Sequence, residues 1–128
     1  MKYAITHIAV YVADLEKSRE YYVTFFGGKS NERYQNNKGF SSYFLTFDGG
    51  VRLEIMHHPL AARREPVDKV TGWSHVAFSV GDEQTVKELT ERIVAAGYAL
   101  YSPPRRTGDG YFESCVGDPD GNRVEITT

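Results

Sequence analysis

Two histidines and two glutamates stand at matching places of a repeated pattern, and these residue types together can bind a transition metal ion. His7 begins the run HIAVYVAD, and His75 begins the similar run HVAFSVGD. Glu54 lies in RLEI, and Glu125 lies in RVEI. Two imidazoles and two carboxylates form the mixed nitrogen and oxygen ligand set that divalent transition ions accept. The pattern predicts one metal site, provided that the fold brings the four side chains together.

Each of these residues taken singly has a simpler structural interpretation. A histidine on a strand is more often hydrogen-bonded or exposed to solvent than a metal ligand, and a glutamate on an alternating strand usually faces water. Recurrence of both types in a duplicated module favours the metal interpretation. We expect a first module at about residues 1–58, a connection at about 59–72 and a second module at about 73–128, together forming a single domain.

The same order of elements is expected in both modules. Asp14 and Asp82 are of the residue type that begins helices, and each follows an alternating strand pattern. In the first module the strands are expected at 5–12, 32–35, 43–47 and 51–56, and in the second at 73–80, 99–102, 111–116 and 123–127. The chain is therefore predicted to be an α+β protein of two tandem βαβββ modules, with the helices on one side of mixed sheets.

Strand alternation assigns the four candidate ligands to one face of the sheets, which we call the inner face. The apolar residues expected to pack against the helices are Ile8, Val10, Val12, Leu53, Ile55, Val76, Phe78, Val80, Val124 and Ile126. The inner face carries His7, Glu54, His75 and Glu125, with Tyr11, Met56, His58 and Ser79 as candidate pocket residues. Arg52 and Arg123 share this face, where they could anchor an anionic substrate or lie at the sheet edge against solvent or a carboxylate.

Composition narrows the class of partner. The formal net charge is −2, so the chain has no strong basic field for nucleic acid or an anionic membrane. Charged residues interrupt every stretch long enough to span a bilayer. Cys115 is the only cysteine, which excludes an internal disulfide and fits a reducing compartment. We expect a cytoplasmic protein that binds a small molecule.

Two longer motifs carry a family resemblance. The segment DLEKSREYYVTFFG resembles the first helix of the vicinal oxygen chelate superfamily, the group of glyoxalases, bleomycin resistance proteins and dioxygenases. The segment GDPDGNRVEI resembles its final turn and strand. The resemblance implies a cup-shaped mixed sheet with the helices outside and, in many members, a homodimer. It also implies one divalent ion, Ni, Zn, Co, Mn or Fe, bound by His7, Glu54, His75 and Glu125.

The complete ligand set resembles that of glyoxalase I and implies a lyase or isomerase. Proton transfer would pass through a metal-stabilised enediolate of a small 2-oxo or hydroxy-carbonyl compound or its thiol adduct. Glu125 is the first choice as general base and Glu54 the alternative. Tyr11 and His58 stand where glutathione-dependent members have Arg and Asn, which counts against glutathione hemithioacetal as the substrate. The alternatives are an epimerase, a thiol transferase or a non-catalytic drug-sequestering protein.

Overall fold

The structure is a computed structural model that describes residues 1–65 and 69–128. The chain divides into two compact units, Met1–Arg64 and Glu65–Thr128, and the division falls inside the segment expected as a connection. Residues 66–68 of that connection lie outside the described part of the chain.

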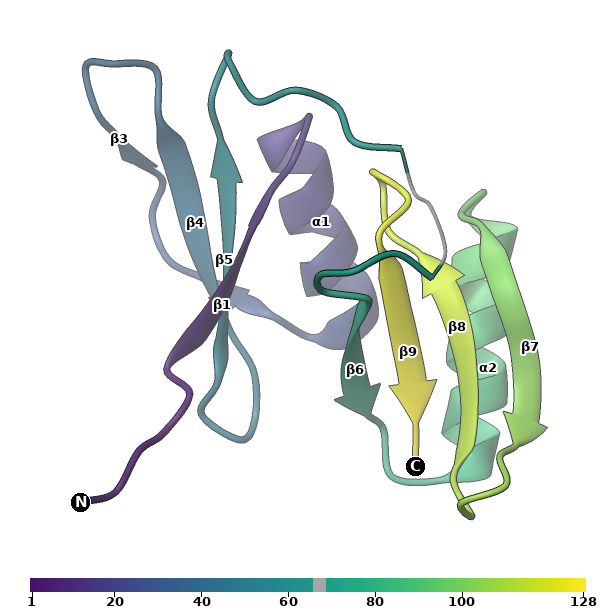
Figure 1. The fold of residues 1–128 in the computed structure, drawn as a ribbon. Helices are drawn as coiled ribbons and strands as arrows, with labels where there is room; N and C mark the ends of the chain where they lie inside the picture. The colour runs from purple at the N-terminus through teal and green to yellow at the C-terminus, as the bar shows by residue number, and fades with distance from the viewer. Residues whose placement is uncertain (66–68) are drawn as a thin grey trace. The chain divides into compact units, whose positions relative to one another are not determined.

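The first unit is a mixed sheet with one helix (Figure 1). Its elements are β1 (His7–Tyr11), α1 (Leu15–Phe26), β2 (Lys29–Ser30), β3 (Tyr34–Gln35), β4 (Ser41–Thr46) and β5 (Arg52–His57). The strands lie in the order β1-β5-β4-β2, and β3 also pairs with β4. The first and last strands, β1 and β5, are parallel neighbours.

The second unit repeats this plan. Its elements are β6 (His75–Ser79), α2 (Glu83–Ala95), β7 (Leu100–Arg106), β8 (Phe112–Gly117) and β9 (Arg123–Thr127). The strands lie in the order β6-β9-β8-β7, and β6 and β9 are again parallel. The predicted α+β class with one βαβββ module in each half of the chain is confirmed, with β2 and β3 together taking the place of the second strand in the first half.

The two helices begin as the sequence predicts. Asp14 Oδ1 accepts a hydrogen bond from Lys17 N at 3.0 Å, and Asp82 Oδ1 accepts one from Thr85 N at 2.7 Å. Each aspartate thereby satisfies a backbone donor that the first helical turn leaves free. Gly27 ends α1 with a φ of 68°, a left-handed conformation that glycine adopts without steric cost.

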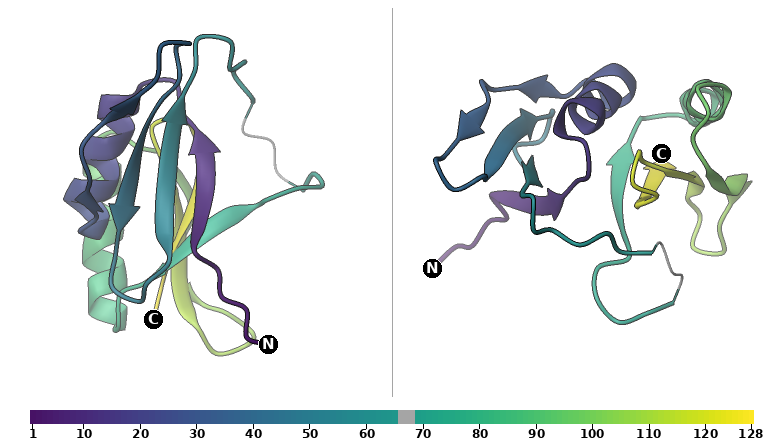
Figure 2. Two further views of the ribbon diagram at one scale, coloured as in Figure 1. Left: turned by 90° about the vertical axis from the view of Figure 1, so that its left-hand side faces the viewer. Right: turned by 90° about the horizontal axis from the view of Figure 1, so that it is seen from above.

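Each helix packs against one face of its own sheet, as Figure 2 shows. Leu53 and Ile55 of β5 are buried on that face, and so are Val124 and Ile126 of β9. Alternation then places Glu54 and Glu125 on the inner face, because successive strand residues point to opposite sides. The predicted assignment of the two glutamates to the face away from the helices is confirmed within each half.

Three local expectations differ from the structure. Ile8, expected to pack against the helix, is 40% exposed because β1 is an edge strand of its sheet. Of the strand expected at 32–35, only 34–35 is a strand, β3, and a further short strand, β2, precedes it; both pair with β4. The strand expected at 99–102 continues to Arg106, and its pairing with β8 shifts register twice.

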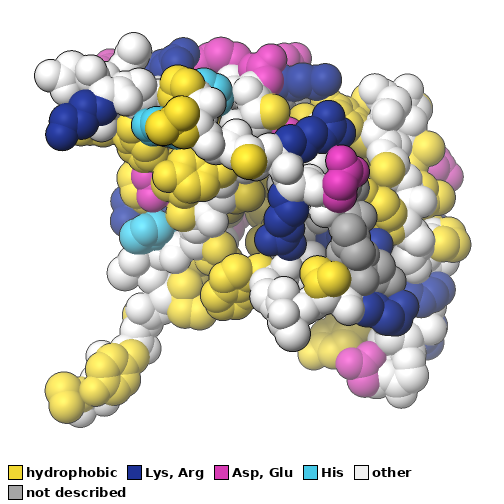
Figure 3. All heavy atoms as spheres, turned by 45° about the horizontal axis from the view of Figure 1, so that its top comes forward, with side chains coloured by type: hydrophobic (Ala, Val, Ile, Leu, Met, Phe, Trp, Pro, Cys, Tyr) yellow, Lys and Arg dark blue, Asp and Glu magenta, His cyan; other side chains and the backbone are white. Residues whose placement is uncertain are grey.

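Apolar side chains are also exposed on the N-terminal segment before β1. Met1, Tyr3 and Ile5 stand largely in solvent, and Figure 3 shows hydrophobic side chains along this extension.

Within the described residues, neither helix has the length and apolar character needed to cross a membrane.

Candidate metal centre

The first His–Glu pair lies on β1 and β5. In the parallel pairing of these strands His7 lies opposite Arg52, and Ala9 lies opposite Glu54. His7 and Glu54 are therefore diagonal neighbours on one face. The Nε2 atom of His7 lies 3.8 Å from Oε1 of Glu54.

The second pair repeats the same register on β6 and β9. His75 lies opposite Arg123, and Ala77 lies opposite Glu125. The Nε2 atom of His75 lies 3.1 Å from Oε2 of Glu125. In both halves, Nε2 of the histidine thus points towards the carboxylate of the equivalent glutamate. The distance is shorter in the second half.

The distance in the second pair suits two ligands of one ion. Donor atoms about 2.1 Å from a zinc ion lie roughly 3 Å apart when they occupy adjacent coordination positions. The second pair already has this spacing, whereas the first is wider. Among the described residues, no group of three or more His, Cys, Asp or Glu is close enough to hold an ion. Each half supplies two donors, and imidazole with carboxylate fits a divalent transition ion.

Glu125 lies in an environment that favours its neutral form. Burial raises its pKa to about 7, together with a hydrogen bond to Glu113 and the negative charge of that residue. The Arg105 guanidinium opposes this shift, and Asp109 adds to it. In the protein without metal, Glu125 therefore exchanges its proton near neutral pH.

The turn before β9 is tightly held. Asp118 is buried, and its carboxylate accepts hydrogen bonds from the backbone N–H groups of Asp120 and Asn122 and from the Asn122 side-chain amide. These bonds fix the start of the strand that carries Glu125.

Arg52 and Arg123 both stack on aromatic rings. The Arg52 guanidinium lies 4.5 Å from the centroid of Phe44, and that of Arg123 lies 4.2 Å from the centroid of Tyr101. Such cation–π contacts hold both guanidinium groups over their own sheets. Neither of the two expected roles, substrate anchor or ordinary edge residue, anticipated the aromatic partner.

The other candidate pocket residues separate into two groups. Tyr11 and Met56 lie opposite each other on β1 and β5, and Ser79 lies opposite Thr127 on β6 and β9. His58 lies beyond the end of β5, and its Nδ1 accepts a hydrogen bond from the Leu60 backbone N–H at 3.1 Å. The structure gives His58 a role in the turn and leaves Tyr11, Met56 and Ser79 on the inner face.

Sequence reasoning missed the hydroxyls that contact the two histidines. Thr6 Oγ1 lies 2.9 Å from Nδ1 of His7, and Ser74 Oγ lies 3.0 Å from Nδ1 of His75. The signal was in the repeat, since a hydroxyl residue precedes each histidine. Glu113, the carboxyl neighbour of Glu125, was also missed, because the residue at its place in the first module is Ser42, which carries no charge.

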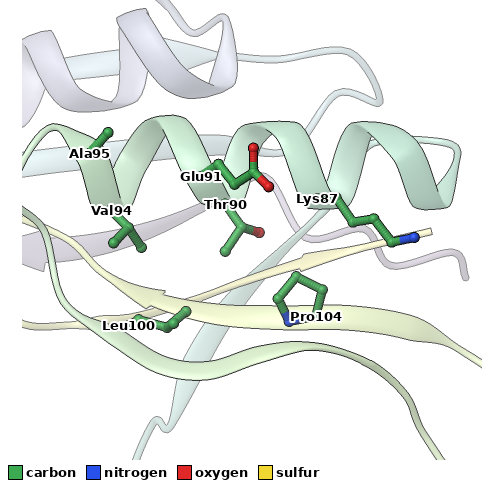
Figure 4. Close-up of a pocket in the computed structure, with 7 residues that line it drawn as sticks. All are labelled: Lys87, Thr90, Glu91, Val94, Ala95, Leu100 and Pro104. Atoms are coloured by element: carbon green, nitrogen blue, oxygen red, sulfur yellow. The ribbon is translucent and has the colours of Figure 1, made fainter.

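A cavity of about 370 Å³ lies elsewhere in the second unit, between α2 and β7 (Figure 4). Thr90 and Val94 of α2 line it together with Leu100 and Pro104 of β7. It adjoins the helix rather than the inner face, and none of the four candidate ligands lines it.

The fold and the repeated pairs define a class of duplicated α+β proteins whose two halves each carry a histidine and a glutamate on parallel first and last strands. The family model of the Glyoxalase/Bleomycin resistance protein/Dioxygenase superfamily matches residues 4–126. The chain belongs to this superfamily.

Relatives and solved structures agree with this assignment. The uncharacterized protein YwkD of Bacillus subtilis is 32% identical over 91 residues, which are 70% of this chain and 71% of YwkD. The glyoxylase/bleomycin resistance protein/dioxygenase domain from Frankia sp. EAN1pec has the same fold, with a TM-score of 0.83, 21% identity and coverage of 99% of this chain and 98% of that one. Glyoxalase I from Zea mays matches with a TM-score of 0.77 and 25% identity over 96% of this chain and 43% of the maize chain.

Proposed function

We propose that the protein is a divalent-metal-dependent lyase or isomerase of the glyoxalase I type. Its substrate is a small 2-oxo or hydroxy-carbonyl compound or its thiol adduct. One observation carries the proposal: a histidine and a glutamate occupy the same diagonal register on parallel strands in both halves of the chain. Similarity to glyoxalase I from Zea mays supports the same chemistry.

The proposal assigns four residues to one ion: His7, Glu54, His75 and Glu125. Neutral imidazole and ionised carboxylate are the required ligand forms, so binding at neutral pH displaces the proton that Glu125 retains there. When bound, the ion supplies Lewis acidity, which lowers the pKa of a carbon acid next to a carbonyl.

A glutamate carries the proton from one substrate carbon to its neighbour. Glu125 is assigned as the base, because a carboxylate released from the ion can accept and return a proton. Glu54 is the alternative, since it occupies the equivalent position on β5. The substrate C–H bond breaks towards the glutamate, and the same proton returns to the adjacent carbon, so the reaction is redox-neutral.

Two measurements test the proposal. Purified protein is analysed for Ni, Zn, Co, Mn and Fe, and loaded protein is assayed for hydrogen–deuterium exchange on a panel of α-hydroxy carbonyl compounds. We expect a bound ion and exchange that stops on chelation. Absence of tight binding for every ion would remove the metalloenzyme proposal. Bound ion without exchange would move the function to thiol transfer or ligand binding.

Stoichiometry tests whether the two pairs share an ion. One ion per chain, lost on substitution of either His7 or His75, is expected for a shared site. Two ions per chain, each lost with only one histidine, would mean that each half binds alone.

A homodimer with shared sites is testable by mixing His7→Ala with His75→Ala protein. If each site combines one pair from each subunit, mixed dimers regain one intact site, whereas a site within one chain gives no recovery.

A cytoplasmic location, which the single buried Cys115 favours, is part of the proposal.

A further inference from the structure

The two candidate histidines are held in the same way on the side away from their glutamates. The hydroxyl of the preceding residue contacts Nδ1 in both halves, at 2.9 Å for Thr6 with His7 and at 3.0 Å for Ser74 with His75. The other ring nitrogen, Nε2, is the one nearest the glutamate in both halves.

This geometry sets the orientation of each ring. An imidazole has two nitrogens, and a partner on one of them determines where the other points and which of them bears the proton. If Nε2 binds an ion through its lone pair, the proton must reside on Nδ1, which then needs a hydrogen-bond acceptor. The hydroxyl oxygens of Thr6 and Ser74 stand where that acceptor is needed.

A hydroxyl suits this position better than a carboxylate or a carbonyl, because it can also donate. In the protein without metal, Nε2–H can donate to a glutamate carboxyl oxygen while the hydroxyl donates to Nδ1. With an ion on Nε2, the ring would carry its proton on Nδ1, and the same hydroxyl would accept it. The contact is therefore available in both states.

The backbone of Thr6 is held against β5. The Thr6 backbone carbonyl accepts a hydrogen bond from the Arg52 N–H at 3.1 Å, which extends the pairing of β1 with β5 by one residue. The His7 ring also lies edge-on to Phe44, with ring centroids 5.4 Å apart. The ring of His7 therefore has two contacts besides Glu54, the Thr6 hydroxyl and Phe44.

We propose that Thr6 and Ser74 are positioning residues, whose hydroxyls hold His7 and His75 with Nε2 aimed at the metal position. The inference rests on the proposed function and adds two residues to that site. Partners in the outer shell of a metal site orient the ligand, and their loss typically lowers metal affinity 10- to 100-fold.

The first test compares substitutions that keep shape with substitutions that keep the hydroxyl. Thr6→Val preserves the branched shape without the hydroxyl, and Thr6→Ser preserves the hydroxyl. Ser74→Ala and Ser74→Thr form the corresponding pair. Thr24→Val, at an exposed position of α1, is the matched control.

Zn²⁺ and Ni²⁺ affinities are measured for the full chain by competition with a chelator. We expect Thr6→Val and Ser74→Ala each to weaken binding about tenfold. Thr6→Ser, Ser74→Thr and Thr24→Val should stay near the wild-type value. Wild-type affinity in Thr6→Val and Ser74→Ala would overturn the positioning role while leaving the proposed function intact.

A second readout does not depend on activity. In Zn²⁺-loaded protein with ¹⁵N-labelled histidine, the Nδ1–H groups of His7 and His75 should exchange slowly with water. Thr6→Val should accelerate exchange at His7 alone, and Ser74→Ala at His75 alone. Unchanged exchange at both rings would overturn the inference. Failure of wild-type protein to bind either ion would instead overturn the proposed function.

Discussion

The two halves share the register of their His–Glu pairs but differ in the residues beside the glutamates. In the first half, Phe44 of β4 lies opposite Glu54, and its ring contacts both His7 and Arg52. In the second half, the residue opposite Glu125 is Cys115, and the nearby Glu113 hydrogen-bonds to the Glu125 carboxyl. One glutamate thus has an aromatic neighbour and the other an ionisable one.

The difference shows which positions the repeated plan holds constant. The spacing of histidine and glutamate depends on the parallel pairing of first and last strands, which both halves have. The residues on the antiparallel strand beside each glutamate differ between the halves, while the register of histidine and glutamate stays the same. The two halves therefore hold their His–Glu pairs in the same register. They differ in the residue beside the glutamate, which is Phe44 in the first half and Glu113 in the second.

The largest expected effect separates the two glutamates in catalysis. Glu125→Gln should lower the rate of proton exchange by about 10³-fold, because it removes the base. Glu54→Gln should lower it less at saturating metal, because it removes a ligand but leaves the base. The measurement is kcat for deuterium exchange at several metal concentrations.

Two controls sharpen this comparison. The metal content of both variants is measured in the assayed samples, so that lost metal is not counted as a lost base. If Glu54→Gln is the more impaired variant when both are fully loaded, the roles of the two glutamates are reversed.

A second prediction concerns the carboxyl neighbour of Glu125 in metal-free protein. The pKa of Glu125 is raised from its ordinary value of 4.5 to about 7, so the folded state holds more protons than the unfolded chain between these values. The free energy of unfolding contributed by Glu125 therefore falls as pH rises through that interval. Glu113→Gln, which removes the neighbouring charge, should lower the pKa of Glu125 and reduce this loss.

Urea unfolding of chelator-treated protein at several pH values between 5 and 8 measures the effect. Glu125→Gln should reduce the pH dependence further than Glu113→Gln does. Glu54→Gln is the matched variant in the first half, because the residue opposite Glu54 on β4 is Phe44 rather than a carboxyl residue. If the free energy of unfolding depends on pH equally in wild type and Glu125→Gln, the prediction is contradicted.

The sequence predicted the elements well where the same pattern of residues occurred in both modules. Alternation on β5 and β9 placed Leu53, Ile55, Val124 and Ile126 towards the helices, and all four are buried. Asp14 and Asp82 mark the helix starts because a capping carboxylate acts locally, within three residues. Interactions so close in sequence can be read without knowing the tertiary structure.

Features set by tertiary neighbours could not be predicted in the same way. Ile8 has the same alternation as Ile55, yet Ile8 lies on an edge strand and Ile55 on one paired on both sides. The aromatic partner of Arg52 lies on β4, and that of Arg123 on β7, so neither contact follows from spacing. Thr6 and Ser74 were predictable, because each hydroxyl is adjacent to its histidine in a repeated motif.

A third prediction concerns the helices, which pack their sheets with side chains of different size. Tyr22 and Phe26 of α1 correspond in the repeat to Thr90 and Val94 of α2, counted from the capping aspartates. The two rings of α1 lie 6.2 Å apart between centroids, whereas the smaller pair lines the cavity beside β7. Phe26→Val should therefore destabilise the first half by about 2 kcal/mol through lost burial.

The converse substitution should stabilise the second half. Val94→Phe places a ring over the pocket of about 370 Å³, which is partly open to solvent, and should raise the free energy of unfolding by up to about 1 kcal/mol. Chemical denaturation of both variants gives the comparison. A destabilised Val94→Phe protein would show that the cavity does not accept a ring in an unstrained rotamer.

The smallest expected effect lies at a single hydroxyl on α1. Among the described residues, Ser18 Oγ is buried without a hydrogen-bond partner, and the corresponding position of α2 is Val86, which is also buried. A buried polar atom without a partner lowers stability, because it has lost its hydrogen bonds to water. Ser18→Ala should therefore leave the free energy of unfolding unchanged or raise it by up to about 1 kcal/mol. Val86→Ala, which deletes apolar contacts at the equivalent site, should lower it instead. If Ser18→Ala destabilises the protein as much as Val86→Ala does, the Ser18 hydroxyl has a partner in solution, and the two helices are more alike than their packing indicates.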